Sequence, residues 1–182
     1  MHNKLDTISL AELQNEIQKL ASDIKEALIQ RGEMMATAES CTGGLVASHI
    51  VDIAGSSAIL AGGIVAYQNE VKANLLNVPA EILDTKGAVS AETVMAMAEG
   101  VRQKFHCEWA VATSGIAGPG GAEPGKPVGT VWMAVANSQK NEAFCEIFSG
   151  NRTEIREKSV YKVLCKLFFE INKQKSTCTN EH

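Results

Sequence analysis

The sequence has 182 residues, of which 45% are hydrophobic and 21% charged, and its formal net charge is −4. This length fits one domain that can bury a hydrophobic core. The longest apolar runs, such as residues 43–53, are shorter than the roughly 20 residues that cross a membrane, and residues 1–20 lack the apolar core of a signal peptide. We therefore expect a cytoplasmic protein with one domain, residues 1–172, and a disordered polar tail, residues 173–182.

Charge and cysteine content exclude several classes of function. The chain is slightly acidic and has no cluster of Lys and Arg, which argues against nucleic-acid binding. Its five cysteines are an odd number with no C-x-x-C pair, and only four histidines accompany them. This pattern indicates neither a disulfide framework nor a zinc site. We expect a small-molecule substrate, no metal and no cofactor.

Apolar periodicity and capping residues predict alternating helices and strands. Apolar residues at helical spacing predict a first helix over residues 8–30, which Gly32 terminates. A strand at residues 34–38 leads through a polar turn into a second helix that ends near Gly55. The remaining predicted elements are a strand at residues 61–67, a helix at residues 69–76 capped by Asn69 and ended by Pro79, a helix from Ser90 to residue 105, strands at residues 109–113, 128–136 and 143–148, and a last helix from Asn151 to about residue 171.

This order of elements predicts helices on both faces of a central sheet. Strands joined through helices run parallel, and the turn at residues 137–141 predicts a hairpin that adds one antiparallel neighbour. We therefore expect an α/β fold, a three-layer α/β/α sandwich with a mixed, mostly parallel sheet of about five strands. Ligands bind such sheets at the carboxyl ends of the strands, and three strand ends here carry reactive side chains.

The first strand end contains Ser40, Cys41, Thr42, Gly43 and Gly44. Small residues let the chain turn sharply into the next helix, whose free N–H groups can bind an oxyanion or a phosphate. Ser40 is the candidate nucleophile. Cys41 is the second choice, since a thiol beside a helix N-terminus can be acidified. In the alternative interpretation, Ser40 or Thr42 only caps the helix.

The second strand end contains Tyr67 and Lys72. A serine nucleophile needs a base, and all four histidines lie in the termini or on predicted helices. A buried lysine in the first turn of a helix can lose its proton and serve as that base, whereas an exposed one is only a surface charge. Tyr67 either forms a hydrogen bond with Ser40 or Lys72 or packs at the edge of the core.

The third strand end contains Thr113, Ser114, Gly115 and Gly118. Glycines let a ligand approach the backbone closely, and the two hydroxyls can form hydrogen bonds with it. No Gly-Lys-Ser/Thr sequence closes this loop, which disfavours ATP hydrolysis. Arg152, beside the predicted cap of the last helix, is either a phosphate ligand or a surface charge.

Seven motifs in order, spanning about residues 15–172, resemble those of the CinA C-terminal domain family. They are residues 37–44, 52–57, 63–72, 87–90, 114–121, 126–131 and 148–152. The resemblance implies the family's three-layer sandwich and a homo-oligomer, most simply a dimer. For stand-alone members it implies an amidase that hydrolyses nicotinamide mononucleotide to nicotinate mononucleotide and ammonia in the pyridine nucleotide cycle. The motifs of the N-terminal nucleotide-binding domain of full-length CinA are absent, so we do not expect its pyrophosphatase activity.

The family motif implies a nucleophile at Ser40, a base at Lys72 and an assisting hydroxyl at Tyr67. Family members often have Gly-Asp-Arg where this chain has Asn151 before Arg152, and Asn caps a helix equally well. Two other functions stay open: a non-catalytic module that binds or senses pyridine nucleotides, and a structural or damage-response interaction protein. The presence of nucleophile and base favours the enzyme, since a sensor needs neither.

Overall fold

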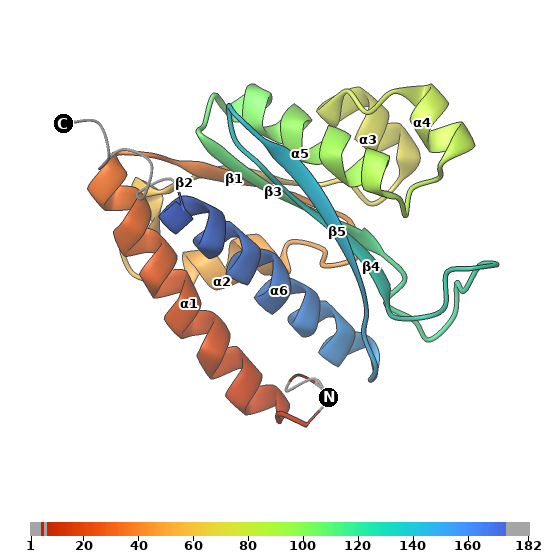
Figure 1. The fold of residues 1–182 in the computed structure, drawn as a ribbon, viewed down its shortest axis with the longest axis horizontal. Coiled ribbons are helices and arrows are strands. Elements are labelled where there is room, and N and C mark those ends of the chain that lie inside the picture. The colour runs from red at the N-terminus through yellow and green to blue at the C-terminus, as the bar shows by residue number, and fades with distance from the viewer. Residues whose placement is uncertain (1–4, 6, 174–182) are drawn as a thin grey trace.

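The computed structural model describes residue 5 and residues 7–173, which form one five-stranded sheet with helices on both faces (Figure 1). The predicted disordered tail lies outside the described residues, except for Lys173 at the end of the last helix. In chain order the elements are α1 (Leu10–Arg31), β1 (Met35–Glu39), α2 (Leu45–Val51), the 3₁₀ helix η2 (Ser56–Ala58), β2 (Leu60–Val65), α3 (Asn69–Leu76), α4 (Ala80–Thr85), α5 (Ala91–Phe105), β3 (Trp109–Gly115), β4 (Thr130–Ala136), β5 (Asn141–Ile147) and α6 (Arg152–Lys173).

The strands follow the order β2-β1-β3-β4-β5 across the sheet. Strand β1 pairs in parallel with both β2 and β3. Strand β4 pairs antiparallel with both β3 and β5, so it runs against the other four strands. The predicted mixed, mostly parallel α/β sandwich is confirmed, including the β4–β5 hairpin.

The two faces of the sheet carry side chains of different size. Helices α1, α2 and α6 cover one face, and α3, α4 and α5 cover the other (Figure 1). Along β3, Trp109 and Val111 belong to the core beneath α1 and α6, while Ala110 and Ala112 belong to the core beneath α5. This alternation follows from the two-residue period of a strand, and the alanines let α5 approach the sheet closely.

Several predicted helix ends are confirmed by their hydrogen bonds. Gly32 ends α1 in the left-handed conformation, with φ 63°. The Ser90 hydroxyl accepts a hydrogen bond from the Thr93 N–H at the start of α5. Asn151 Oδ1 accepts hydrogen bonds from two N–H groups in the first turn of α6, at 2.9 and 3.1 Å.

Three features of the helices differ from the prediction: one capping residue, one helix end and one additional helix. Asn69 is the first helical residue of α3, and Gln68, with extended backbone, occupies the capping position without a side-chain hydrogen bond. Helix α2 ends at Val51 rather than near Gly55, because the chain turns there to enter η2. Helix α4 was not predicted: Pro79 precedes it, since a residue without an N–H costs nothing at a helix start, and six residues are too few to show a helical period.

Helices α3 and α5 meet at Gly100. A Cβ atom added at Gly100 would overlap the backbone carbonyl oxygen of Leu76, the last residue of α3. Glycine is therefore required for the backbones of these two helices to approach this closely. Because α3 also carries Lys72, this contact fixes the position of that lysine relative to the sheet.

We expect Gly100→Ala to lower the free energy of unfolding by about 1–3 kcal/mol, because overpacking forces the two helices apart. Urea denaturation measures this change. Gly120→Ala is the matched control, since a Cβ there meets no atom within 4 Å. The control should not lower stability, and an equal loss in both variants would contradict the proposed role of Gly100.

Candidate active site

The carboxyl ends of β1, β2 and β3 lie at one edge of the sheet. Glu39, the last residue of β1, pairs in register with Val65 of β2 and Thr113 of β3. The chain leaves β1 through α2 on one face and leaves β2 through α3 on the other (Figure 1). Connections that diverge to opposite faces open a crevice at this edge, which is where α/β sheets bind ligands.

Ser40 and Lys72 meet in this crevice. Lys72 Nζ lies 3.3 Å from Ser40 Oγ and donates to the backbone carbonyls that follow β2, at 2.9 Å to Ala66 and 3.1 Å to Tyr67. The Lys72 side chain is 1% exposed and Ser40 is 9% exposed. The sequence prediction placed this lysine at the start of α3, and the structure aims it inward at the serine rather than toward solvent.

The buried position of Lys72 changes its acid–base chemistry. Burial lowers the pKa of the Lys72 ammonium below its ordinary value, because removing a charge from water is costly, and the Cys41 thiol has a smaller effect in the opposite direction. No carboxylate forms an ion pair with Lys72 among the described residues. A lysine in this setting can lose its proton and accept another from a neighbouring hydroxyl.

A buried carboxylate organises the turn after Ser40. Glu39 is 1% exposed, and its two oxygens accept four hydrogen bonds from the turn and from the start of α2. The donors are the Thr42 hydroxyl (2.7 Å) and the N–H groups of Gly44 (2.9 Å), Val46 (3.0 Å) and Ala47 (2.9 Å). Glu39 thus caps α2, the role that the alternative interpretation gave to Ser40 or Thr42.

Thr42 connects this turn to β3 and to α6. Its hydroxyl donates to Glu39, so the 2.7 Å contact between the Thr42 and Thr113 hydroxyls has Thr113 as the donor. Its carbonyl accepts a 2.6 Å hydrogen bond from Nη2 of Arg156. Neither Glu39 nor Arg156 was predicted from the sequence to have a role in the site. A charged residue directly before a Gly-rich helix start is the signal that points to Glu39, whereas Arg156 lies 114 residues from its acceptor.

The two glycines of the turn are both left-handed. Gly43 has φ 62° and Gly44 has φ 93°, values that residues with a Cβ rarely adopt. A Cβ at Gly43 would lie 3.5 Å from Arg156 Nη2, so this residue also leaves room for the guanidinium. Their roles are therefore to shape the turn, and Gly44 additionally donates to Glu39.

Cys41 is buried beside the nucleophile. Burial raises the pKa of its thiol to about 12, and the neighbouring backbone N–H groups and the Arg156 guanidinium only partly offset this effect. The thiol is therefore protonated at neutral pH. A protonated thiol is a poor nucleophile, which favours Ser40 over Cys41 as the attacking group.

The structure turns the side chains of the third strand end inward. The buried Ser114 hydroxyl donates to the carbonyl of Ala88, and Thr113 is held by Thr42. Gly115 lies against β4, where a Cβ would crowd the backbone at Thr130 and Val131. These residues therefore pack inside the protein beneath the carboxyl end of β3.

Arg152 joins two loops at the mouth of the crevice. Its Nη1 donates to the carbonyl of Gly118 at 2.7 Å, and its Nη2 donates to the Tyr67 hydroxyl at 3.1 Å. Tyr67 therefore contacts Lys72 through its backbone carbonyl and Arg152 through its side chain, which is 60% exposed. The structure thus brings Tyr67, Gly118 and Arg152 together at the open side of the crevice.

Histidines and metal ligands do not form a competing site in the described part of the chain. His49 Nε2 lies 2.8 Å from Glu157 in the contact between α2 and α6, away from Ser40. The described residues contain no group of three or more His, Cys, Asp or Glu that could hold a metal ion. None of their helices is long and apolar enough to cross a membrane.

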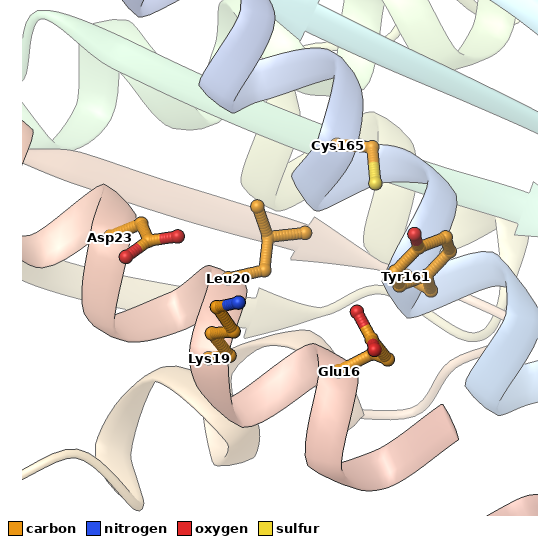
Figure 2. A pocket seen from close by; sticks show the side chains of 6 residues that line it. All are labelled: Glu16, Lys19, Leu20, Asp23, Tyr161 and Cys165. Carbon is orange, nitrogen blue, oxygen red and sulfur yellow. The ribbon is translucent and has the colours of Figure 1, made fainter. Parts of the chain in front are cut away.

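A separate pocket of about 190 Å³ lies between α1 and α6. Figure 2 shows side chains of both helices facing it, among them Tyr161 and Cys165 of α6. Burial raises the pKa of both groups, that of Tyr161 to about 12. Both groups are therefore protonated at neutral pH, and the pocket contains none of the residues of the crevice.

The family of this chain follows from comparison with known proteins. The model of the CinA C-terminal domain matches residues 17–171. The chain belongs to the CinA C-terminal domain family. The matched range contains the Ser40–Lys72 pair, the Glu39 carboxylate and both arginines of α6, so the crevice lies within the family domain.

Individual CinA relatives agree with this assignment. A CinA-like protein of Synechococcus sp. (strain CC9902) is 44% identical over 150 residues, which are 81% of this chain and 36% of the relative. The chain therefore spans about a third of the length of the curated relatives it matches. Among solved structures, competence damage-inducible protein A (ComA) of Klebsiella pneumoniae is similar with a TM-score of 0.83 and 36% identity, covering 86% of this chain and 97% of that one. Competence/damage inducible protein CihA of Agrobacterium tumefaciens is similar with a TM-score of 0.82 and 40% identity, covering 86% and 96%.

The raised pKa of Cys41 predicts that its thiol reacts slowly with alkylating reagents. We expect iodoacetamide at pH 8 to alkylate the exposed Cys145 well before Cys41 in the folded protein, because Cys41 is both buried and protonated. Peptide mass spectrometry over a time course measures both rates. In urea the two rates should become similar. If iodoacetamide alkylated Cys41 as fast as Cys145 in the native protein, Cys41 would again be a candidate nucleophile.

Proposed function

We propose that this chain is an amidohydrolase that converts nicotinamide mononucleotide to nicotinate mononucleotide and ammonia in the cytoplasm. The observation that carries the proposal is the buried Lys72 amine 3.3 Å from the Ser40 hydroxyl. Burial lowers the pKa of this lysine, so it is suited to act as a base. Membership of the CinA C-terminal domain family supports the same reaction, since the family motif implies a Ser/Lys amidase.

The hydrogen bonds of Lys72 suggest how it activates the serine. A neutral amine has two N–H bonds and one lone pair. Its N–H groups donate to the carbonyls of Ala66 and Tyr67, which leaves the lone pair for the proton of Ser40. Ser40 Oγ attacks the carboxamide carbon as this proton moves to Nζ. The tetrahedral intermediate collapses when Nζ returns the proton to the departing nitrogen, and ammonia leaves an acyl ester on Ser40.

Water completes the reaction by the same route. Neutral Lys72 takes a proton from water, the hydroxide attacks the ester, and the proton returns to Ser40 Oγ as nicotinate mononucleotide leaves. Each step uses one proton that Lys72 carries and returns. These steps need neither a metal ion nor an organic cofactor.

Arg152 is the proposed ligand of the substrate phosphate. It lies at the mouth of the crevice with Gly118 and Tyr67, and a guanidinium has more N–H donors than the two contacts that Arg152 makes there. The nicotinamide ring would then lie between Arg152 and Ser40, at the carboxyl end of β3, where Thr113 and Ser114 lie. The same binding mode without turnover would describe a pyridine-nucleotide sensor.

We expect Lys72→Met to lower kcat for ammonia release by about 10²- to 10⁴-fold, the contribution of a general base. Ser40→Ala should abolish formation of the acyl intermediate and leave nucleotide binding in place. Ammonia release from nicotinamide mononucleotide measures the first effect, and calorimetric titration measures binding.

Lys86→Met is the matched control for the lysine substitution, because Lys86 is exposed and pairs with Glu92 on the surface. It should leave kcat unchanged. Ammonia release that persists in Ser40→Ala would show that the nucleophile is wrong. Binding without any ammonia release by the wild type would favour the sensor.

The pH profile should report the ionisation of Lys72. Because the neutral amine is the active form, kcat/KM should rise with pH and level off after Lys72 loses its proton. Burial lowers this pKa, so the midpoint should lie below the ordinary lysine value of about 10.4. Initial rates across pH 6–10 measure this rise. A flat profile over the whole range would contradict Lys72 as the titrating base.

A further inference from the structure

The backbone N–H groups of the turn after Ser40 are almost all occupied within the protein. Ser40 donates its N–H to the carbonyl of Thr113 at 2.9 Å, and Gly43 donates to the carbonyl of Ser40 at 3.1 Å. The N–H groups of Gly44 and of the first turn of α2 donate to Glu39. In the described structure, the N–H groups of Cys41 and Thr42 donate to no oxygen of another residue, and the acceptor they approach is the Cys41 sulfur, a weak acceptor that an oxyanion can replace.

Cys41 and Thr42 directly follow the nucleophile, so their N–H groups are the pair that can bind an oxyanion. Successive N–H groups that no oxygen of the protein occupies, next to a nucleophilic serine, are the usual donors for a tetrahedral intermediate. The directions of these two N–H bonds are set by the orientations of the peptide planes on either side of Cys41 and Thr42. A donor pair stabilises the transition state only where these planes are fixed before the substrate arrives.

Thr42 is the residue whose surroundings fix those planes. It is fully buried, with 0% of its side chain exposed. Glu39 holds its hydroxyl from the β1 side, and Arg156 holds its carbonyl from the α6 side. Glu157, the residue after Arg156 on α6, forms a 2.8 Å hydrogen bond with His49 of α2. This contact holds α6 against α2 and so keeps Arg156 close to the turn.

We propose that Glu39 and Arg156 are positioning residues that clamp Thr42, so that the Cys41 and Thr42 N–H groups bind the oxyanion. The expected change in kcat rests on the proposed function. Glu39 and Arg156 act on the transition state through Thr42 and do not touch the substrate. Arg156 also brings a positive charge to this end of the crevice. Its charge lowers the pKa of the Cys41 thiol, whereas the Glu39 carboxylate raises that pKa by more, so Arg156 offsets part of the Glu39 charge beside the turn.

Arg156 and Arg152 have different proposed roles, which kcat and KM distinguish. Arg152 lies at the mouth of the crevice, where its loss should weaken binding of the substrate phosphate and raise KM. Arg156 contacts the turn, where its loss should lower kcat with little change in KM, because the oxyanion exists only after attack. If Arg156 instead bound the substrate phosphate, its loss would raise KM and leave kcat nearly unchanged.

The test uses kinetics together with 3-pyridylboronic acid, which carries the ring but no phosphate. The Ser40 hydroxyl adds to its trigonal boron, the proton passes to Lys72, and the anionic tetrahedral boronate places one of its two hydroxyl oxygens in the oxyanion site. Boron-11 NMR distinguishes this tetrahedral adduct from free reagent. Its dissociation constant reports the oxyanion site even if nicotinamide mononucleotide is not the substrate.

We expect Arg156→Met to lower kcat about tenfold or more and to weaken the boronate adduct by a similar factor, with KM within about twofold of the wild type. Arg156→Lys keeps the charge and one donor, so it should recover part of both losses. Glu39→Gln should show the same pattern as Arg156→Met. Lys162 lies on α6, as Arg156 does, and pairs with Glu146 of β5. Lys162→Met removes this cation and should change neither kcat nor the affinity of the boronate adduct.

The outcomes separate this inference from the proposed function. Absence of ammonia release by a wild type that forms the boronate adduct would overturn the proposed substrate, and the adduct series would still decide the clamp. Wild-type adduct affinity in both Arg156 variants would overturn the clamp. A raised KM with unchanged kcat and adduct affinity would overturn it as well and would make Arg156 a phosphate ligand. Should Glu39→Gln fail to fold, the Arg156 pair decides the question, because Arg156 is only half-buried.

Discussion

The burial of one lysine amine is the constraint on which the site depends. Lys72 reaches Ser40 only because α3 lies close against α5, where Gly100 leaves no side chain between the two backbones. The alanines on the α5 face of the sheet have the same effect, since they bring that helix layer inward. Two carbonyls after β2 then replace the water that the amine loses. Packing far from the serine thus sets the chemistry of the base.

A second buried charge organises the other half of the site. Glu39 accepts four hydrogen bonds and takes up the free N–H groups at the start of α2. An unpaired buried carboxylate would be very costly, so this arrangement couples the end of β1 to the beginning of α2. The base and the turn are therefore built separately, Lys72 from the α3–α5 layer and the turn from the α2–α6 layer. They meet at Ser40.

Local patterns in the sequence predict the elements better than they predict the site. Long amphipathic helices, the strands and the caps at Gly32 and Ser90 follow from periodicity and from residues within one turn. Helix α4 escapes prediction because it is too short to show a period. Arg156 escapes because its contact to Thr42 joins distant parts of the chain. Tyr67 shows a further difficulty: the motif marks its hydroxyl, while its backbone carbonyl is the group that contacts Lys72.

The same structure limits how an anionic substrate can be held. The sequence suggested that helix N–H groups bind the phosphate, but Glu39 occupies those of α2. At α6, Asn151 accepts from the first-turn N–H groups, and the Glu154 carboxylate accepts the N–H of Asn151. A phosphate placed on that helix axis would meet the carboxylate at close range. Apart from the Cys41 and Thr42 N–H groups beside Ser40, side-chain guanidinium groups, which project away from the helix ends, are therefore the donors available to a phosphate at this edge of the sheet.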